Sequence, residues 1–262
     1  MNALRAAIVR GARSSVRRGS ARRSPRPGDG LEFAQLRGYV DGDDPRRIDW
    51  SATARTGALQ TRIFYEETAL VLALLADASG SMQVGRRRPL ADAAAEAERA
   101  WFGAADADDR ILRIDGDRLV AGRAARAHVP APGAFSLEHG LRFAVRVLPR
   151  NASLLVISDA FAPAPGDLLL LEAAARFDAT VLLARDPWHD GIPLRGWRRV
   201  RDAESGATRI VRFGRAARER YVRAVAERER EIETRFARAG WRFGLLEERD
   251  GTASLERAFA LR

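Results

Sequence analysis

The sequence predicts an α/β fold built on a doubly wound, mostly parallel sheet with an inserted β-hairpin. Two runs that are apolar apart from Ser153, at residues 70–76 and 153–157, are each the length of a strand buried on both faces, and a helical pattern follows each of them. The same alternation of strand and helix recurs around residues 179–184 and 241–247. Repeated strand-helix units of this kind form parallel sheets covered by helices on both faces.

The first 27 residues carry eight arginines and no acidic residue. This composition predicts a disordered Arg-rich leader, and it is also typical of transit peptides and of basic arms that touch nucleic acid or lipid headgroups. Residues 28–68 are rich in turn formers and are expected to pack on the core. Their apolar anchors are Leu36, Tyr39, Ile48 and Trp50, and residues 59–68 alternate like a half-exposed strand leading into the central one.

Charged residues of both signs gather within residues 43–55. We expect an Arg-carboxylate network that fixes a loop, with a catalytic acid/base pair as the alternative. The residues concerned are Asp43, Asp44, Arg46, Arg47, Asp49 and Arg55.

The remaining elements follow from periodicity and capping signals. Asp115-Gly116 predicts a hairpin over residues 110–120, and Ser136 is placed to cap a helix that carries one apolar stripe. A second hairpin is expected at residues 194–213, as an insertion in the domain formed by residues 69–250. The expected helices span residues 89–102, 137–148, 165–177, 215–239 and 251–262, and residues 121–135 are expected to form a loop.

The composition excludes several chemistries. All 45 basic residues are arginine and there is no cysteine, which removes phosphate-binding lysines, Schiff-base lysines, disulfides and thiolate sites. The net charge of +10 is concentrated at the N-terminus, because arginine alternates with Asp and Glu elsewhere. The apolar runs are too short to span a membrane, so a soluble, cytoplasmic protein is expected.

Oxygen-bearing side chains follow both central strands. Asp77, Ser79 and Ser81 follow the first strand, and Ser158 and Asp159 end the second. Carboxylates and hydroxyls at the carboxyl ends of neighbouring parallel strands suit Mg²⁺, Mn²⁺ or Ca²⁺. These residue types also form ordinary turns and helix caps, which is the alternative interpretation.

Asp77-Ala-Ser79-Gly-Ser81 together with Ser158-Asp159 resembles the metal-ion-dependent adhesion site of the von Willebrand factor A fold, which is Rossmann-like. Residues 42–55 are similar to the signature of the bacterial family known as domain of unknown function 58. That resemblance implies that Asp77, Ser79, Ser81 and Asp159 hold the cation. The fold also uses a threonine from a second loop; Phe135, which cannot bind a cation, stands there, and Ser136 could substitute if the loop shifted by one residue.

The resemblance implies a non-enzymatic protein-interaction module whose cation accepts an acidic residue of a partner. Members of the family are commonly encoded beside MoxR-type AAA+ ATPases, so the expected role is accessory to such an ATPase in assembly or maturation of protein complexes. Two alternatives stay open. One is binding of an anionic surface or nucleic acid by the Arg-rich N-terminus, although specific nucleic-acid binding is not expected. The other is a hydrolase that uses Asp77 and Asp159.

Overall fold

The computed structural model describes residues 3–19, 33–64, 69–129, 133, 135–160 and 165–261. The chain divides into two compact units. Residues 1–19 and 70–262 form the larger core unit, and residues 20–69 form the smaller one. Within the described residues, no helix combines the length and apolar character needed to cross a membrane.

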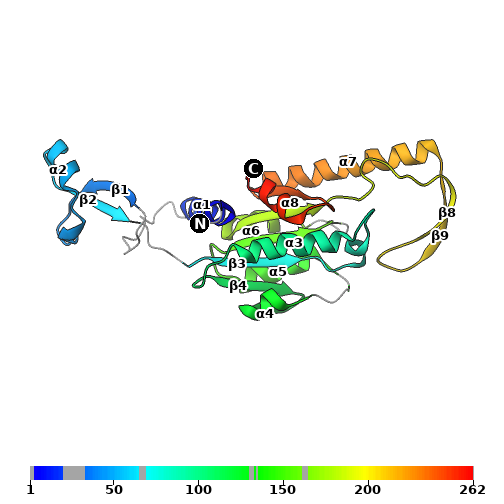
Figure 1. The fold of residues 1–262 in the computed structure, drawn as a ribbon, viewed down its shortest axis with the longest axis horizontal. Coiled ribbons are helices and arrows are strands. Elements are labelled where there is room, and N and C mark those ends of the chain that lie inside the picture. The colour runs from blue at the N-terminus through cyan, green and yellow to red at the C-terminus, as the bar shows by residue number, and fades with distance from the viewer. Residues whose placement is uncertain are drawn as a thin grey trace. The chain divides into compact units, whose positions relative to one another are not determined.

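The core unit alternates strands and helices along most of its length (Figure 1). Its elements are α1 (Ala3–Gly19), β3 (Val71–Ala76), η2 (Gly80–Gln83), α3 (Leu90–Gly103), β4 (Arg110–Asp115), β5 (Arg118–Ala121), α4 (Arg123–Ala127), α5 (Leu137–Val147), β6 (Ser153–Ser158), α6 (Asp167–Arg176), β7 (Asp178–Ala184), β8 (Gly196–Arg201), β9 (Thr208–Phe213), α7 (Arg215–Arg238), β10 (Arg242–Leu246) and α8 (Gly251–Ala258).

Six of these strands form one sheet in the order β10-β7-β6-β3-β4-β5. All neighbouring strands are parallel except β5, which returns antiparallel to β4 through the predicted Asp115-Gly116 turn. The mixed α/β architecture with a mostly parallel central sheet therefore agrees with the prediction. Ribbon β8–β9 is a separate two-stranded antiparallel sheet, at the place predicted for the inserted hairpin.

The core lies on both faces of the six-stranded sheet. Leu72 and Leu74 of β3 pack with residues of α1, α3 and α8, whereas Ala73 and Leu75 pack with residues of α5, α6 and α7. Successive side chains of a strand point to opposite faces, so a strand buried on both sides must be apolar at every position. This explains why the run at 70–76 has no polar residue.

The N-terminal segment corrects the expectation of a disordered leader. Residues 3–19 form helix α1, whose Leu4 and Ile8 are buried in the core unit. Arg5 pairs with Asp106 and Asp109, and Gly11 lies so close to Asp178 that a β-carbon there would be 2.2 Å from Asp178 Oδ2. Residues 20–27, the rest of the predicted leader, lie outside the described residues.

The smaller unit contains β1 (Phe33–Gly38), η1 (Pro45–Arg47), α2 (Trp50–Thr56) and β2 (Gln60–Phe64). Strands β1 and β2 pair antiparallel with each other. Residues 20–69 are grouped as a compact unit of their own, and the expectation that residues 28–68 pack on the core stays a prediction. The side chain of Trp50, expected to be an anchor, is 68% exposed.

One local prediction differs from the structure, because the predicted loop at 121–135 contains helix α4. Within the predicted strand at 59–68 the structure shows β2, and residues 65–68 lie outside the described part of the chain. The five residues of α4 were missed because they carry no periodic apolar pattern; Ala125 alone among them is buried.

Candidate cation site at the carboxyl ends of β3 and β6

The candidate site lies where the strand order reverses direction. From β3 the chain moves outward to β4 and β5, then returns to the other side of β3 with β6 and continues to β7 and β10. In open α/β sheets the crevice at such a reversal, outside the carboxyl ends of the strands, is where ligands bind. β3 and β6 are parallel neighbours with Ala76 opposite Ile157, so the residues that follow each strand emerge side by side.

Asp77 and Ser158 join the two strands directly. The Ser158 hydroxyl donates to Asp77 Oδ2 at 2.7 Å, and the backbone N–H of Asp77 donates to the carbonyl of Ile157 at 2.8 Å. The other carboxylate oxygen of Asp77 accepts the N–H of Ser79 at 2.8 Å. Each of these carboxylate oxygens retains a second lone pair, so the buried carboxylate is fixed in position and can still accept.

The loop that follows β3 and carries Asp77, Ser79 and Ser81 is called the first loop. Its two serine hydroxyls face each other. Ser79 Oγ lies 2.9 Å from Ser81 Oγ. Magnesium binds oxygen at about 2.0–2.1 Å in octahedral geometry, so neighbouring ligand oxygens are separated by about 2.8–3.0 Å. The two hydroxyls are hydrogen-bonded to each other, and their separation is also that of one edge of such an octahedron.

Asp159 follows β6 and is half-buried. The next residue, Ala160, has a φ of 51°, which turns the chain sharply after the strand. Its N–H donates to Ser158 Oγ at 3.0 Å, and its carbonyl accepts from the guanidinium of Arg228 on α7. The long helix therefore holds the loop that carries Asp159.

The second loop precedes α5 and includes Gly133, Phe135 and Ser136. Neither of its two described side chains is placed as a clear cation ligand. Phe135 is half-buried against the apolar cluster on the α5 side of the sheet. The Ser136 hydroxyl accepts the N–H of His139 at 3.3 Å, so it caps α5 as predicted. Gly133 nevertheless reaches the first loop, because its N–H donates to the carbonyl of Ala78 at 3.3 Å.

A further carboxylate, which the sequence did not indicate, comes from the turn between β8 and β9. Glu204 Oε1 accepts the N–H of Ser81 at 2.7 Å. The turn passes so close to the first loop that a β-carbon on Gly80 would be 2.1 Å from the carbonyl oxygen of Ala203. The local sequence predicts a hairpin here, but the position of its turn next to the first loop is determined by the fold of the whole domain.

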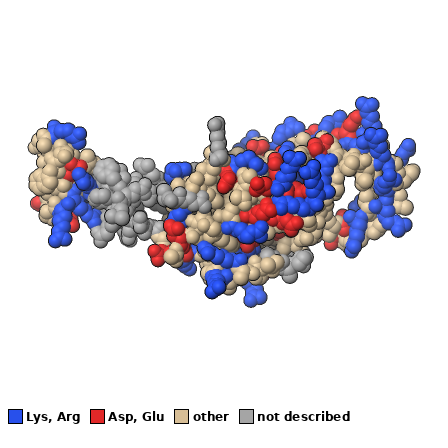
Figure 2. Space-filling view, viewed as in Figure 1, with Lys and Arg blue, Asp and Glu red and all other residues tan. Residues whose placement is uncertain are grey.

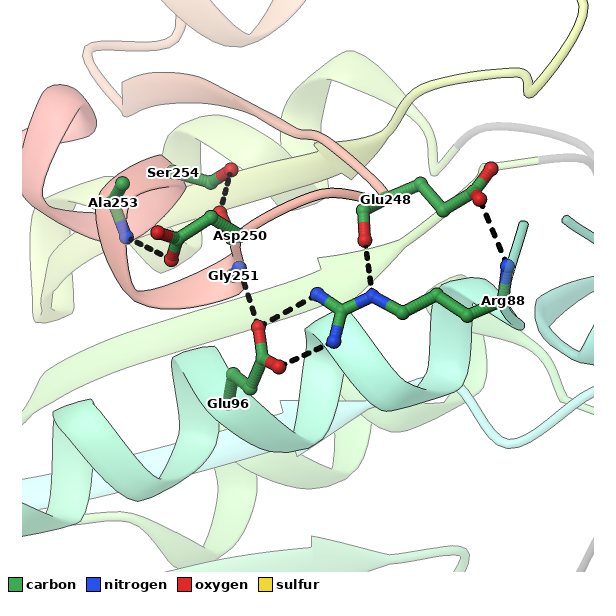
Figure 3. Close-up of polar contacts among 7 residues, drawn as sticks. All are labelled: Arg88, Glu96, Glu248, Asp250, Gly251, Ala253 and Ser254. Carbon is green, nitrogen blue, oxygen red and sulfur yellow. Dashed lines mark hydrogen bonds and ion pairs between the residues drawn. The ribbon is translucent and has the colours of Figure 1, made fainter. Parts of the chain in front are cut away.

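The segment after η2 is tied to the C-terminal part of the chain. The Glu248 carboxylate accepts three successive backbone N–H groups, those of Arg86, Arg87 and Arg88. Arg88 in turn pairs with Glu96 on α3, which also accepts the N–H of Gly251 at 2.9 Å (Figure 3). This network fixes the chain between the candidate site and α3.

The same contacts lower the pKa values of both glutamates. The hydrogen bond from Arg88 is the main cause that lowers the pKa of Glu96 from 4.5 to about 2. For Glu248, burial acts to raise the pKa, but the backbone N–H groups that it accepts outweigh this effect and lower it. Both side chains are therefore ionised at neutral pH.

The charged residues of the smaller unit form ion pairs and helix caps within that unit. This agrees in part with the predicted Arg-carboxylate network. Asp43 pairs with Arg37 at 2.7 Å, and Asp49 pairs with Arg62 at 2.9 Å while capping α2 through the N–H of Ala52. The N–H groups of Val40 and Ala52 are the main causes that lower the pKa values of Asp43 and Asp49, respectively. The sequence prediction named the aspartates but missed both of these arginine partners.

The remaining residues of the predicted network occupy simpler positions. The Asp44 side chain accepts the N–H of Arg46 at 2.9 Å and so caps η1. Arg46 and Arg55 are exposed, whereas Arg47 is half-buried. These positions favour a structural role for this part of the signature.

The donors of the candidate site fit a hard cation of the magnesium type. They are carboxylate and hydroxyl oxygens, with two hydroxyls at octahedral spacing. Among the described residues there is no group of three or more His, Asp or Glu side chains placed to hold a metal. A cation at this position would therefore depend on the serine hydroxyls.

The fold defines the chain as a mixed α/β protein with polar side chains gathered at the switch point of a mostly parallel sheet. A family model described as "Protein of unknown function DUF58" matches residues 35–111 and 117–231, and the chain belongs to this family.

Curated relatives include the uncharacterized proteins Rv1480 of Mycobacterium tuberculosis (strain ATCC 25618 / H37Rv) and Mb1516 of Mycobacterium bovis (strain ATCC BAA-935 / AF2122/97). Each is 28% identical over 232 residues, covering 79% of this chain and 71% of the relative.

Two solved structures also show similarity. An aerotolerance-related membrane protein from Bacteroides fragilis NCTC 9343 has a TM-score of 0.41 at 13% identity, covering 72% of this chain and 96% of that one. BatB from Bacteroides thetaiotaomicron has a TM-score of 0.40 at 12% identity, covering 73% and 96%. At these TM-scores the likeness carries no argument about this chain.

Proposed function

We propose that this protein is a non-enzymatic protein-interaction module of the von Willebrand factor A type, with a hard-cation site at the carboxyl ends of β3 and β6. The observation that carries the proposal is the 2.9 Å spacing of Ser79 Oγ and Ser81 Oγ beside the Asp77–Ser158 pair, at the switch point of the sheet. Asp77, Ser79, Ser81 and Asp159 are the proposed ligand residues. The cation supplies a positive charge that can attract a carboxylate of a partner protein.

The rest of the proposed role follows from the resemblance in the first loop and the smaller unit. The partner is a MoxR-type AAA+ ATPase, or a protein on which that ATPase works, and the contact is made through an acidic residue. Since no cysteine or lysine is present and the serines of the first loop face each other, the side chains of the site are suited to ion binding. Their arrangement offers no activated nucleophile.

Cation binding is tested by titrating Mn²⁺ into the full chain and measuring heat. Wild type is expected to bind one ion, and the double variant Ser79→Ala/Ser81→Ala is expected to lose binding while retaining its fold, because it removes two small hydroxyls. Asp77→Ala should also lose binding. The control is Asp108→Ala, which removes an exposed carboxylate elsewhere in the core unit. Equal binding by wild type and the double variant would contradict the proposal.

The partner is tested by co-purification from cells that also express a MoxR-type ATPase, with Mg²⁺ or with EDTA. We expect recovery with Mg²⁺ and loss with EDTA. Recovery that is independent of both the ion and Ser79→Ala/Ser81→Ala would place the contact elsewhere on the protein.

One observation favours a second candidate, binding of an anionic membrane surface. The ribbon β8–β9 exposes Trp197 and Ile210, each 65% accessible, on the face that also carries Arg199 and Arg212. Basic side chains gather along the ribbon in Figure 2, whereas over α7 they are mixed with acidic ones. An exposed aromatic ring among arginines suits the interface of an anionic bilayer.

Co-sedimentation with phosphatidylglycerol-containing and pure phosphatidylcholine vesicles tests this candidate. Binding to the first vesicles alone, reduced by Trp197→Ala, is expected.

A further inference from the structure

We propose that Glu204, at the tip of the β8–β9 ribbon, is a ligand of the cation site and completes it from within the chain. This inference rests on the proposed function, because it assigns a ligand to the same site. It depends on the contacts between one hairpin turn and the loop that follows β3.

The Glu204 carboxylate already lies at the site. Its Oε1 accepts the N–H of Ser81 at 2.7 Å, and Ser81 carries one of the two facing hydroxyls. A carboxylate held by one oxygen still has its second oxygen, Oε2, with which to bind an ion. The two residues are 123 positions apart in the sequence, so the fold of the domain brings them together.

The turn that carries Glu204 is built to hold one conformation. Asp202 Oδ1 accepts the N–H of Ser205 at 2.8 Å, the Ser205 hydroxyl at 2.8 Å and the N–H of Glu204 at 3.2 Å. Gly206, with a φ of 68°, donates to the carbonyl of Asp202 at 3.0 Å and closes the turn. The Glu204 backbone is therefore ordered without help from the candidate site.

The close approach of the turn depends on a glycine in the first loop. Gly80 has no β-carbon, and one added there would be 2.1 Å from the backbone oxygen of Ala203. Backbone cannot yield as the end of a flexible side chain does. A residue other than glycine at position 80 would force the turn, and Glu204 with it, away from Ser81.

The site also lacks one oxygen that Glu204 can supply. The second loop places Phe135 against the apolar core and uses the Ser136 hydroxyl to cap α5. A hard cation needs about six oxygen ligands, and its affinity rises with the number of carboxylates among them. Glu204 adds an anionic oxygen on the side of the site that faces the ribbon. A carboxylate from a partner takes that position only by displacing the turn.

The test compares Glu204→Gln with wild type in the full chain, using two probes. Mn²⁺ affinity is measured by calorimetry, and the number of water molecules on bound Tb³⁺ is measured from its luminescence lifetimes in H₂O and D₂O. We expect Glu204→Gln to weaken Mn²⁺ binding by roughly tenfold or more and to add about one water to Tb³⁺, because an anionic ligand is replaced.

Two further variants sharpen the comparison. Gly80→Ala keeps every carboxylate but moves the turn, and it is expected to reproduce both effects of Glu204→Gln. Glu233→Gln removes an exposed carboxylate from α7 and is expected to behave like wild type. Circular dichroism of each variant verifies that the fold is kept.

The outcomes separate this inference from the proposed function. If wild type binds Mn²⁺ and Glu204→Gln binds it equally, or if the Tb³⁺ hydration number does not change, Glu204 is not a ligand and the inference fails alone. If wild type does not bind Mn²⁺, the proposed function fails and the inference falls with it.

Discussion

Ser158 and Asp77 are joined by a hydrogen bond of 2.7 Å between the ends of two parallel strands that are 81 residues apart in sequence. The same hydroxyl accepts the N–H of Ala160, so a single side chain orders the carboxylate on β3 and the turn after β6. Four predictions follow from this and other contacts of the core unit.

Replacing Ser158 by alanine is expected to destabilise the protein by about 1–2 kcal/mol, because a buried carboxylate oxygen and a backbone N–H lose their partner. Chemical denaturation measures the change. Ser153→Ala is the matched control, since Ser153 is buried on the same strand and its hydroxyl has no hydrogen-bond partner among the described residues. Ser153→Ala should change stability by no more than about 0.5 kcal/mol. Equal losses in both variants would argue against the role of the Ser158–Asp77 bond.

Replacing Ile8 by alanine is expected to cost about 2–5 kcal/mol, because Ile8 is fully buried where α1 packs in the core unit. The measurement is urea denaturation of the full chain. Arg10→Ala, an exposed position on the same helix, should stay within about 0.5 kcal/mol of wild type. A neutral Ile8→Ala would mean that α1 does not belong to the folded core.

Replacing Glu98 by glutamine is expected to destabilise the protein by about 3–5 kcal/mol, because the buried guanidinium of Arg113 loses its ion-pair partner and keeps only the hydrogen bond from its Nε to the Ala125 carbonyl. Burial already lowers the pKa of Arg113 to about 10. The double variant Arg113→Met/Glu98→Leu should recover most of the loss, since neither charge is then buried. Denaturation of the single variants Arg113→Met and Glu98→Leu and of the double variant gives the coupling energy. Simple additivity of the two changes would contradict the pairing.

Replacing Glu96 by glutamine is expected to cost about 1–3 kcal/mol at pH 7, because Arg88 loses its ionised partner. The pKa of Glu96 is lower in the folded protein than in the unfolded chain, so the unfolded state takes up a proton first as the pH falls. The stabilisation is therefore complete above about pH 4.5 and is lost as the pH falls toward about 2.

Denaturation of wild type and Glu96→Gln across this pH range measures the difference. The difference between them should shrink over that window. The matched control is Glu138→Gln on the exposed face of α5, where the ion pair with Arg142 contributes about 0.5 kcal/mol or less. A difference between wild type and Glu96→Gln that did not vary with pH would rule out this interpretation.

The sheet was predictable because strands buried on both faces leave an unmistakable pattern. The runs at 70–76 and 154–157 have no polar residue, and each is followed by a helical repeat with a capping residue or proline. Parallel pairing of two such strands then places Asp77 and Ser158 side by side, as the structure shows.

Other features depend on contacts that local sequence does not contain. Helix α1 was missed because Leu4 and Ile8 are scattered among arginines. A short apolar stripe of this kind predicts a buried helix only when the core surface on which it packs is known. Glu204 was missed for a similar reason. The Glu204-Ser-Gly206 turn signals a hairpin, but the position of its tip is set by the sheet and by α7.

The loop after β3 also has a consequence for synthesis on the ribosome. Glu204 and Glu248 reach back to it across 123 and 161 residues, respectively. During translation this loop emerges early, yet the carboxylates that hold its backbone N–H groups appear only when most of the domain has been made. The central strands of the sheet can associate before that stage, so a nascent chain passes through a stage in which these strands can be paired while the backbone of this loop is not yet held by Glu204 and Glu248.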